Sequence, residues 1–321
     1  MQWPAGWPAE ETAWVDLSAD GLIAVSGEDA VTFLQGQLTS DVRKLNGRVA
    51  QYSGMCSPKG RLYASFLLSS DELAAGAATI WLHLPESQSE FVRKRLLMYV
   101  LRSKVKLEDA ASQWRRIGLF GTGAVALLQR AFNMLPERDL GVVHAGGGRL
   151  IRLGAQRFLL CVPEAAGRPD WLSEVPEVSA ERWRWLDIRD GIARIVPETR
   201  EEFVPQMVNF DLTGAVDFGK GCYTGQEIVA RMQYLGRLKR RMYRVHAAEP
   251  LTAGEEIYSP DLEGQPGGRI VDAAPAPEGG WDALAVVQIA SAGQVPLHAG
   301  ALDGTELVLR ELPYVVAAPD A

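Results

Sequence analysis

The order of hydrophobic and polar positions predicts alternating helices and strands over the first 190 residues. Apolar side chains recur at helical spacing within 30–38, 86–101, 124–132 and 180–190. Short β-branched and aromatic runs between them predict strands at 22–25, 48–56, 61–69, 79–84, 105–107, 116–120, 150–153 and 158–162. Within 86–101 the positions expected to face inward are Phe91, Leu96, Leu97, Val100 and Leu101. The succession of strand, helix, strand and strand occurs twice, so we predict two α+β units, although no sequence repeat relates them.

The pattern changes after residue 241. Short strand-like runs separated by glycine- and proline-rich turns predict a small antiparallel β-barrel. These runs are 242–246, 256–258, 268–271, 284–289 and 306–312. We therefore expect one region at 1–236, made of units at about 1–110 and 111–236, and a C-terminal barrel domain at 237–321. Residues 195–218 lack periodicity and are expected to form a loop over a site.

A glycine-rich stretch, DFGKGCYTGQEIVARM, occupies residues 217–232. Thr224 and Glu227 have the spacing of a capping box, and Tyr223 and Ile228 that of a hydrophobic staple. This pattern predicts a helix that begins at Thr224 and ends near Gly236. The glycines match neither of the common phosphate-binding motifs, so the spacing alone favours a glycine-rich turn before a capped helix, with an inert cysteine.

Cys222 lies two residues before this predicted helix and two after Lys220. A helix N-terminus and a neighbouring ammonium group both favour a thiolate, so we expect Cys222 to be reactive if it is exposed. The alternative is a small buried residue without chemistry.

Composition limits the possible functions. The chain has 321 residues, 47% of them hydrophobic, and a net charge of −7, which argues against broad nucleic-acid binding. Its three cysteines and four histidines are scattered, so we expect no disulfide framework and no tightly bound metal. The first residues lack the features of a secretory signal and no apolar run is long enough to cross a membrane. We therefore predict a cytoplasmic protein without membrane partners.

The segment KGCYTGQEIVARMQYLGRLKRR, at 220–241, resembles the signature of the YgfZ family. Members of this family are folate-binding proteins implicated in iron–sulfur cluster maintenance and are similar to the folate-dependent aminomethyltransferase of glycine cleavage. Further matching segments lie at 33–42, 56–66, 186–195 and 203–223. The resemblance implies an α+β fold with two interleaved T-protein-like units and a C-terminal β-barrel around a central folate-binding hole.

The resemblance also implies tetrahydrofolate or a derivative as cofactor. Trp183 matches a folate-contacting tryptophan of the family, although a core aromatic on a helix is the simpler interpretation of that residue. A second stacking tryptophan of some members is missing near residue 20. The remaining residues expected to line the folate site are Arg189, Gln206, Asn209, Tyr223, Gln226, Glu227 and Arg231, each of which could instead have a structural role.

The aminomethyltransferases rely on a carboxylate in the segment that aligns with 54–65. No aspartate or glutamate occurs between residues 42 and 70, and Lys59 and Arg61 stand there instead. A cationic side chain cannot take the proton-handling role of a carboxylate at neutral pH. We therefore expect no classical aminomethyltransferase reaction.

These observations predict a folate-binding accessory protein that assembles or repairs iron–sulfur enzymes, with Cys222 and Lys220 in its motif as the reactive residues. Its expected partners are folate and iron–sulfur client enzymes or assembly factors. Two alternatives remain, a folate-dependent one-carbon transferase and a tRNA-modification factor that acts on RNA. The basic run at 236–244 is expected to be a solvated linker, and we do not expect direct RNA binding.

Overall fold

The computed structural model describes residues 11–71 and 79–316. The chain divides into two compact units, of which the first comprises 1–53 and 66–180 and the second comprises 54–65 and 181–321. The tip of one β-hairpin, 54–65, thus belongs with the C-terminal half of the chain. The expected domains, 1–236 and 237–321, divide the chain differently and stay a prediction.

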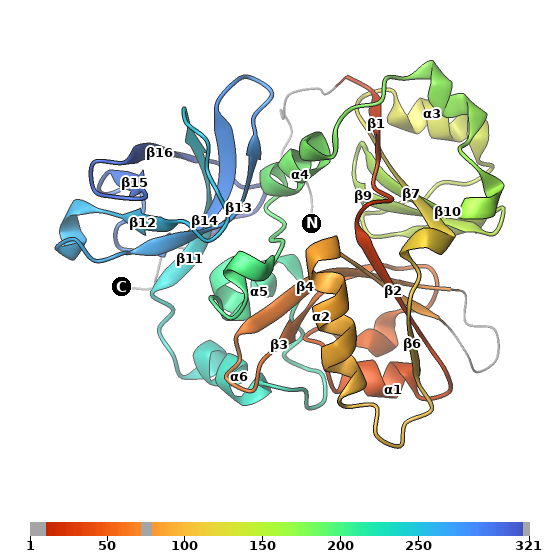
Figure 1. The fold of residues 1–321 in the computed structure, drawn as a ribbon, viewed down its shortest axis with the longest axis horizontal. Coiled ribbons are helices and arrows are strands. Elements are labelled where there is room, and N and C mark those ends of the chain that lie inside the picture. Colours follow the sequence, from red (N-terminus) through yellow and green to blue (C-terminus); the bar gives the residue numbers. More distant parts are fainter. Residues whose placement is uncertain (1–10, 72–78, 317–321) are drawn as a thin grey trace. The chain divides into compact units, whose positions relative to one another are not determined.

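Two antiparallel sheets form most of unit 1 (Figure 1). The first has the strand order β1-β7-β10-β9-β8, and the second β3-β4-β5-β2-β6. The first sheet consists of β1 (Ala13–Asp16), β7 (Trp114–Phe120), β8 (Val142–Ala145), β9 (Gly148–Gly154) and β10 (Arg157–Pro163). The second consists of β2 (Gly21–Ser26), β3 (Gln51–Cys56), β4 (Leu62–Ser70), β5 (Ile80–Leu84) and β6 (Lys106–Asp109).

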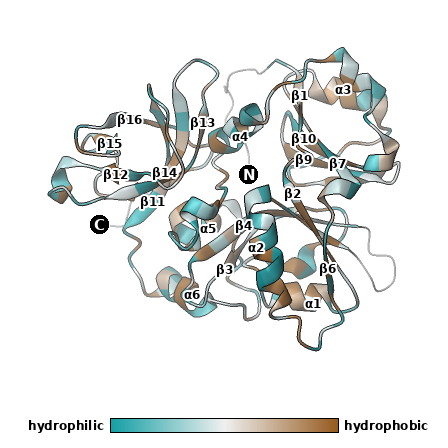
Figure 2. Ribbon diagram, in the orientation of Figure 1, coloured by the Kyte–Doolittle hydropathy of each residue, from teal (hydrophilic) through white to brown (hydrophobic). Residues whose placement is uncertain are grey.

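Three α-helices of unit 1 agree with the predicted pattern in place but not always in length. They are α1 (Ala30–Gln35), α2 (Glu86–Leu97) and α3 (Ala124–Ala131). Helix α2 is shorter than expected, and Leu97 and Leu101 are exposed rather than inward. Much of α2 is coloured hydrophilic in Figure 2, in agreement with a helix that buries a narrow stripe.

Unit 1 buries an arginine between two tryptophans. The guanidinium of Arg149 lies 4.2 Å from the ring centroid of Trp81 and 4.5 Å from that of Trp114. Arg149 pairs in register with Cys161 on the neighbouring strand. Burial raises the pKa of Cys161, although the charges of Arg149 and Arg116 act in the opposite direction. This thiol is therefore part of the core.

The C-terminal part of unit 2 is a closed antiparallel barrel with the strand order β11-β14-β13-β12-β15-β16 (blue in Figure 1). Its strands are β11 (Arg240–Ala247), β12 (Glu256–Tyr258), β13 (Gly268–Pro275), β14 (Trp281–Gln288), β15 (Leu297–Ala299) and β16 (Thr305–Arg310). Small and branched side chains such as Val245, Ile270 and Ala285 fill its interior. The predicted α+β fold with a C-terminal barrel is confirmed.

Helices α4 (Ala180–Arg189), α5 (Phe210–Thr213) and α6 (Gln226–Tyr234) precede the barrel. Residues 195–218, expected to be a loop, instead contain the 3₁₀ turns Pro197–Thr199 and Pro205–Val208 as well as α5. No helix in the described parts of the chain is long and apolar enough to cross a lipid bilayer.

Candidate functional site

The glycine-rich turn of 217–225 and the tip of the β3–β4 hairpin contact each other within unit 2. A Cβ on Gly225 would lie 2.3 Å from the carbonyl oxygen of Ser57 and 3.0 Å from the Cα of Gly60. Gly225 also has a φ of +82°, which side chains disfavour. On the other side, a Cβ on Gly60 would lie 2.8 Å from the Cβ of Ile228. Two motifs more than 150 residues apart in the sequence therefore form one backbone-to-backbone contact.

This contact changes where α6 begins. The helix begins at Gln226 with Gly225 as its N-cap, and no side chain caps it. The predicted capping box of Thr224 and Glu227 is therefore wrong, because the left-handed Gly225 lies between the two residues that had to cooperate. The predicted staple of Tyr223 and Ile228 has the wrong register for the same reason. Cys222 lies four residues before the first helical residue instead of two.

Gln206 fastens α6 to the preceding turn. Its side chain is 2% exposed, and its Nε2 donates to the carbonyl of Val229 at 2.8 Å. Its Oε1 is buried and has no donor among the described residues. The Nε2 group of this amide thus has a structural role, whereas its Oε1 could still accept a hydrogen bond.

Asn209 links three segments of unit 2. It has a left-handed backbone, with a φ of +61°, between the Pro205–Val208 turn and α5. Its Nδ2 donates to the carbonyl of Met242 at 2.9 Å, and Arg241 approaches its Oδ1 at 3.3 Å. Arg241 also forms a two-pronged ion pair with Asp211, at 2.6 and 2.7 Å. The sequence indicated Asn209 but not this ion pair, because the partners are 30 residues apart.

Helix α4 is attached to the barrel through its two neighbouring side chains Arg184 and Trp185. Arg184 Nε donates to the buried carboxylate of Asp272 at 2.5 Å, and Trp185 Nε1 donates to Asp282 at 2.8 Å. Asp282 also accepts from Arg244 at 2.7 Å and contacts His246 Nδ1 at 2.9 Å. Burial raises the pKa of Asp272, whereas hydrogen bonds from Arg244, His246 and Trp185 outweigh desolvation and lower the pKa of Asp282.

The residues of α4 expected to bind folate are differently placed. The side chain of Trp183 is only 4% exposed, so in this structure it offers little free ring surface for stacking. Arg189 is half-buried, with its guanidinium 5.4 Å from the Trp185 ring and its Nε 2.9 Å from a carboxylate oxygen of Asp190. Just after the helix, the hydroxyl of Tyr314 donates to the carbonyl of Gly191 at 2.8 Å. Tyr314 was missed, since no motif surrounds it.

The three cysteines have different environments. Cys222 is exposed, whereas Cys56 and Cys161 are buried. Burial raises the pKa of Cys56 to about 12. Lys220 is buried, and its Nζ lies 4.9 Å from the centroid of the Tyr223 ring, which is itself buried. Burial also raises the pKa of the Tyr223 hydroxyl. Cys222 is thus the thiol that a reagent or partner can reach.

The remaining expected residues lie on α6. Gln226 is half-buried, and Glu227 and Arg231 are exposed. The structure therefore places the expected set in two groups. The buried group consists of Trp183, Gln206, Asn209, Lys220 and Tyr223. The second group is half-buried or exposed and consists of Arg189, Cys222, Gln226, Glu227 and Arg231.

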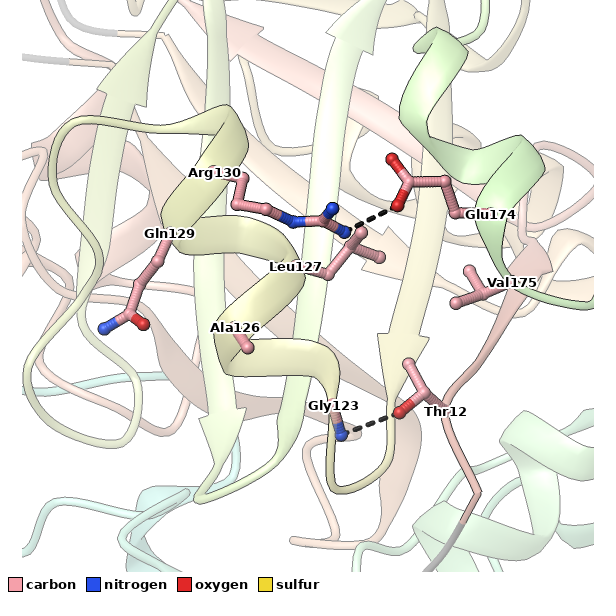
Figure 3. A pocket seen from close by; sticks show the side chains of 8 residues that line it. All are labelled: Thr12, Gly123, Ala126, Leu127, Gln129, Arg130, Glu174 and Val175. Carbon is pink, nitrogen blue, oxygen red and sulfur yellow. Dashed lines mark hydrogen bonds and ion pairs between the residues drawn. The ribbon is translucent and has the colours of Figure 1, made fainter.

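A hollow beside α3 in unit 1 is lined by other residues (Figure 3). Its lining comprises Thr12, Gly123, Ala126, Leu127, Gln129, Arg130, Glu174 and Val175. Two pairs of its polar groups bind each other, since Arg130 pairs with Glu174 at 2.6 Å and Thr12 Oγ1 accepts from the amide of Gly123 at 2.7 Å. None of the expected site residues lines it. Within 11–71 and 79–316, no three His, Cys, Asp or Glu residues form a group suited to a metal ion.

Comparisons with known proteins give a clear relationship. Residues 9–167 match the family described as GCVT N-terminal domain. The chain is 29% identical over 315 residues to the tRNA-modifying protein YgfZ of Colwellia psychrerythraea, covering 96% of this chain and 95% of that protein. It is 32% identical to the protein of the same name from Serratia proteamaculans, covering 71% of this chain and 69% of that protein.

The fold is also similar to a solved structure, the glycine cleavage system aminomethyltransferase T of Bartonella henselae. The TM-score is 0.75 at 19% identity, covering 96% of this chain and 87% of the other. At this identity the likeness concerns the fold alone. The sequence relationships confirm the resemblance inferred from the glycine-rich motif, and the chain belongs to the YgfZ family.

Proposed function

We propose that this protein is a cytoplasmic, folate-binding accessory protein for the assembly or repair of iron–sulfur enzymes, with Cys222 as its reactive residue. The observation that carries the proposal is the exposure of Cys222 in the motif of the family while the other two cysteines are buried. Solvent access is required of a thiol that exchanges with a partner or contacts a soft metal. A single thiol cannot hold a cluster alone, so the cluster belongs to the partner.

The chemistry of unit 2 fits a folate. A folate has a flat pterin with hydrogen-bond donors and a tail with carboxylates. The buried Oε1 of Gln206 lacks a donor among the described residues, and a pterin N–H is the kind of group that would satisfy it. The guanidinium groups of Arg189 and Arg231 suit the carboxylates of the tail. When bound, the folate would supply a carrier for one-carbon units, while these residues bind and orient it.

The names of the relatives refer to tRNA modification. We connect this protein to tRNA through client enzymes that carry iron–sulfur clusters, rather than through RNA bound by this chain. The net charge of −7 supports this indirect connection, because RNA binding draws on an excess of cations.

The fold of an aminomethyltransferase suggests a second function, folate-dependent aminomethyl transfer. The hairpin tip at 54–65 that contacts the glycine-rich turn has no carboxylate, and neither has the longer stretch from 42 to 70. We therefore expect the purified protein to release no ammonia from an aminomethylated carrier in the presence of tetrahydrofolate. Folate-dependent turnover that survives purification would favour this second function instead.

Replacement of Cys222 by serine tests the proposal. Because Cys222 is exposed, Cys222→Ser should leave thermal stability and tetrahydrofolate affinity unchanged. In cells that lack their own copy, the variant should fail to restore the activity of an iron–sulfur enzyme. Cys161→Ser, which alters a buried thiol, serves as a control whose expected defect is in stability. Full restoration by Cys222→Ser would show that the motif is only a scaffold.

Labelling of the native protein with a mild alkylating agent gives an independent check. Cys222 should react first and Cys56 and Cys161 only on unfolding, because both are buried and have raised pKa values. Equal labelling of all three in the native state would contradict the proposed role.

A further inference from the structure

Helix α6 is attached to unit 2 along one side. Val229 is its buried residue and accepts a hydrogen bond from Gln206, while Ile228, at the edge of this side, contacts Gly60 and stays partly exposed. With about 100° between successive residues, Glu227, Arg231 and Tyr234 lie on the side of α6 away from Val229, and the C-cap Leu235 follows directly. The structure leaves this outer side uncovered.

The outer side carries large apolar groups. Tyr234 is 69% and Leu235 is 84% exposed, and Ile228 adds a smaller exposed area. The ring of Tyr234 packs edge-on against the ring of Phe218, with the two ring centroids 6.2 Å apart. Neighbouring exposed apolar residues, one of which packs against a second aromatic ring, are typical of an interaction surface.

In the described part of the chain, helix α6, the hairpin tip that contacts it and the segment that follows it carry three cations without an ion-pair partner, against one exposed carboxylate on the helix, that of Glu227. Among the described residues, Lys59, Arg231 and Lys239 form no ion pair, whereas Arg241 and Arg244 nearby are held by Asp211 and Asp282. No aspartate or glutamate occurs between residues 228 and 248. This charge is opposite to the net charge of −7 of the whole chain. We call Lys59, Ile228, Arg231, Tyr234, Leu235 and Lys239 the α6 outer face.

We propose that the α6 outer face docks a protein partner whose own surface presents an apolar patch ringed by aspartate and glutamate. Carboxylates would meet the three unpaired cations, and the apolar patch would cover Tyr234 and Leu235. A nucleic acid fits less well, since Ile228 and Leu235 have no aromatic face on which a base could stack. In addition, Arg241 and Arg244 are already neutralised.

The position of Cys222 gives this surface a function. The turn that contains it runs from Phe218, which contacts the last residue of α6, back to Gly225, the N-cap. Exposed Cys222 therefore lies beside the α6 outer face. A partner docked on this face meets the thiol. The inference rests on the proposed accessory role and names the chemistry of the partner for that role.

Site-specific photocrosslinking tests this surface. Tyr234 is replaced by p-benzoylphenylalanine in the full chain, and cells producing it are irradiated. We expect one adduct that resists ribonuclease, is destroyed by protease and contains an acidic protein. Leu302, an exposed apolar residue of the barrel, is the control position and should give no such adduct.

The identified protein is then purified and its affinity for this chain measured. The double change Lys59→Glu and Lys239→Glu, at two exposed positions outside the expected folate site, should weaken binding at least about tenfold and remove the crosslink. Arg102→Glu with Arg138→Glu changes the net charge equally at exposed sites elsewhere and should leave affinity unchanged. An adduct with RNA, lipid or a second copy of this chain would overturn the proposal. So would a lack of adduct, or a partner indifferent to the charge reversal.

Tetrahydrofolate binding and complementation of the same variants separate this inference from the proposed function. If complementation depends on Cys222 but is unaffected by the double charge reversal, the docking surface is refuted and the accessory role stands. If Cys222→Ser complements fully, the accessory role fails, whatever binds to α6.

Discussion

The ring of Tyr314 occupies the space that a side chain at residue 191 would need. A Cβ built on Gly191 would lie 2.6 Å from the Tyr314 hydroxyl oxygen, and Gly191 has a φ of +68°. The hydroxyl donates to the carbonyl of the same glycine at 2.8 Å and lies 3.4 Å from Nδ2 of Asn209. A residue close to the C-terminal end of the described chain thus joins the end of α4 to the segment before α5.

This relationship predicts a specific coupling between two substitutions. Gly191→Ala should lower the free energy of unfolding by roughly 2–4 kcal/mol, from the left-handed backbone and the clash with the ring. Tyr314→Ala also destabilises, but it removes the clash. The double variant should therefore lose less stability than the sum of the two single variants, as measured by urea unfolding. Simple additivity would show that the ring and the glycine do not share this space.

A second prediction concerns the contact between the hairpin and the glycine-rich turn. Gly225→Ala should be strongly destabilising, by about 3 kcal/mol or more, because the added Cβ meets the backbone oxygen of Ser57, which cannot move aside cheaply. Gly221→Ala is the matched control, since that position has no atom within 4 Å of an added Cβ and no strained φ. Thermal melting of the two variants gives the measurement. Equal melting temperatures would refute the close contact.

The sequence predicted the barrel and most strands because a strand that buries one face has an alternating pattern of side chains. This pattern is local and does not depend on which strand pairs with it. The sequence missed β1, β8 and β15, which are only three or four residues long and depend on pairing with their neighbours. It also placed the start of α6 wrongly, because a local capping pattern was overridden by a contact between Gly225 and Ser57, far apart in the chain. Long-range packing, which a local pattern does not contain, decided both cases.

The candidate site could be predicted only in part, because long-range contacts also hold several of its residues. The family resemblance indicated Cys222, whose exposure no spacing rule determines, and the role of this residue stays a prediction. The hydrogen bonds of Gln206 to Val229 and of Asn209 to Met242 join residues 23 and 33 positions apart. Residue type alone could not show that both amides are tied down inside the fold.

A third prediction concerns Trp183, for which core and ligand roles remain to be separated. With 4% exposure, Trp183→Ala should lower the free energy of unfolding by about 3–5 kcal/mol. Trp183→Phe keeps an aromatic ring and should cost less, so it allows tetrahydrofolate affinity to be measured on a folded protein. If the ring stacks on folate, this variant should weaken binding by about 1 kcal/mol or more, by titration calorimetry. Unchanged affinity would leave the residue with a core role only.

The last prediction is a dependence of stability on alkaline pH that involves Cys56. Burial raises the pKa of this thiol from a reference value of 9.0 to about 12 in the folded protein. A group whose pKa is raised by folding contributes its full stability below the unfolded pKa and loses it as the pH rises toward the folded pKa.

Between about pH 9 and 12 the unfolded chain therefore releases a proton that the folded chain retains, and one such group lowers stability by about 1.4 kcal/mol per pH unit. Cys56→Ala removes this titration, so its loss of stability between pH 8.5 and roughly 10 should be smaller than that of the parent by about 1 kcal/mol. Burial also raises the pKa values of buried Tyr223 and half-buried Tyr314, and at Tyr223 the charge of the Cys56 thiolate adds a smaller increase that Cys56→Ala removes. Urea unfolding at each pH measures the difference. Cys222→Ala, at an exposed position, is the control for the loss of a thiol as such. Parallel profiles for the parent and Cys56→Ala would show that the Cys56 thiol ionises as readily in the folded as in the unfolded chain.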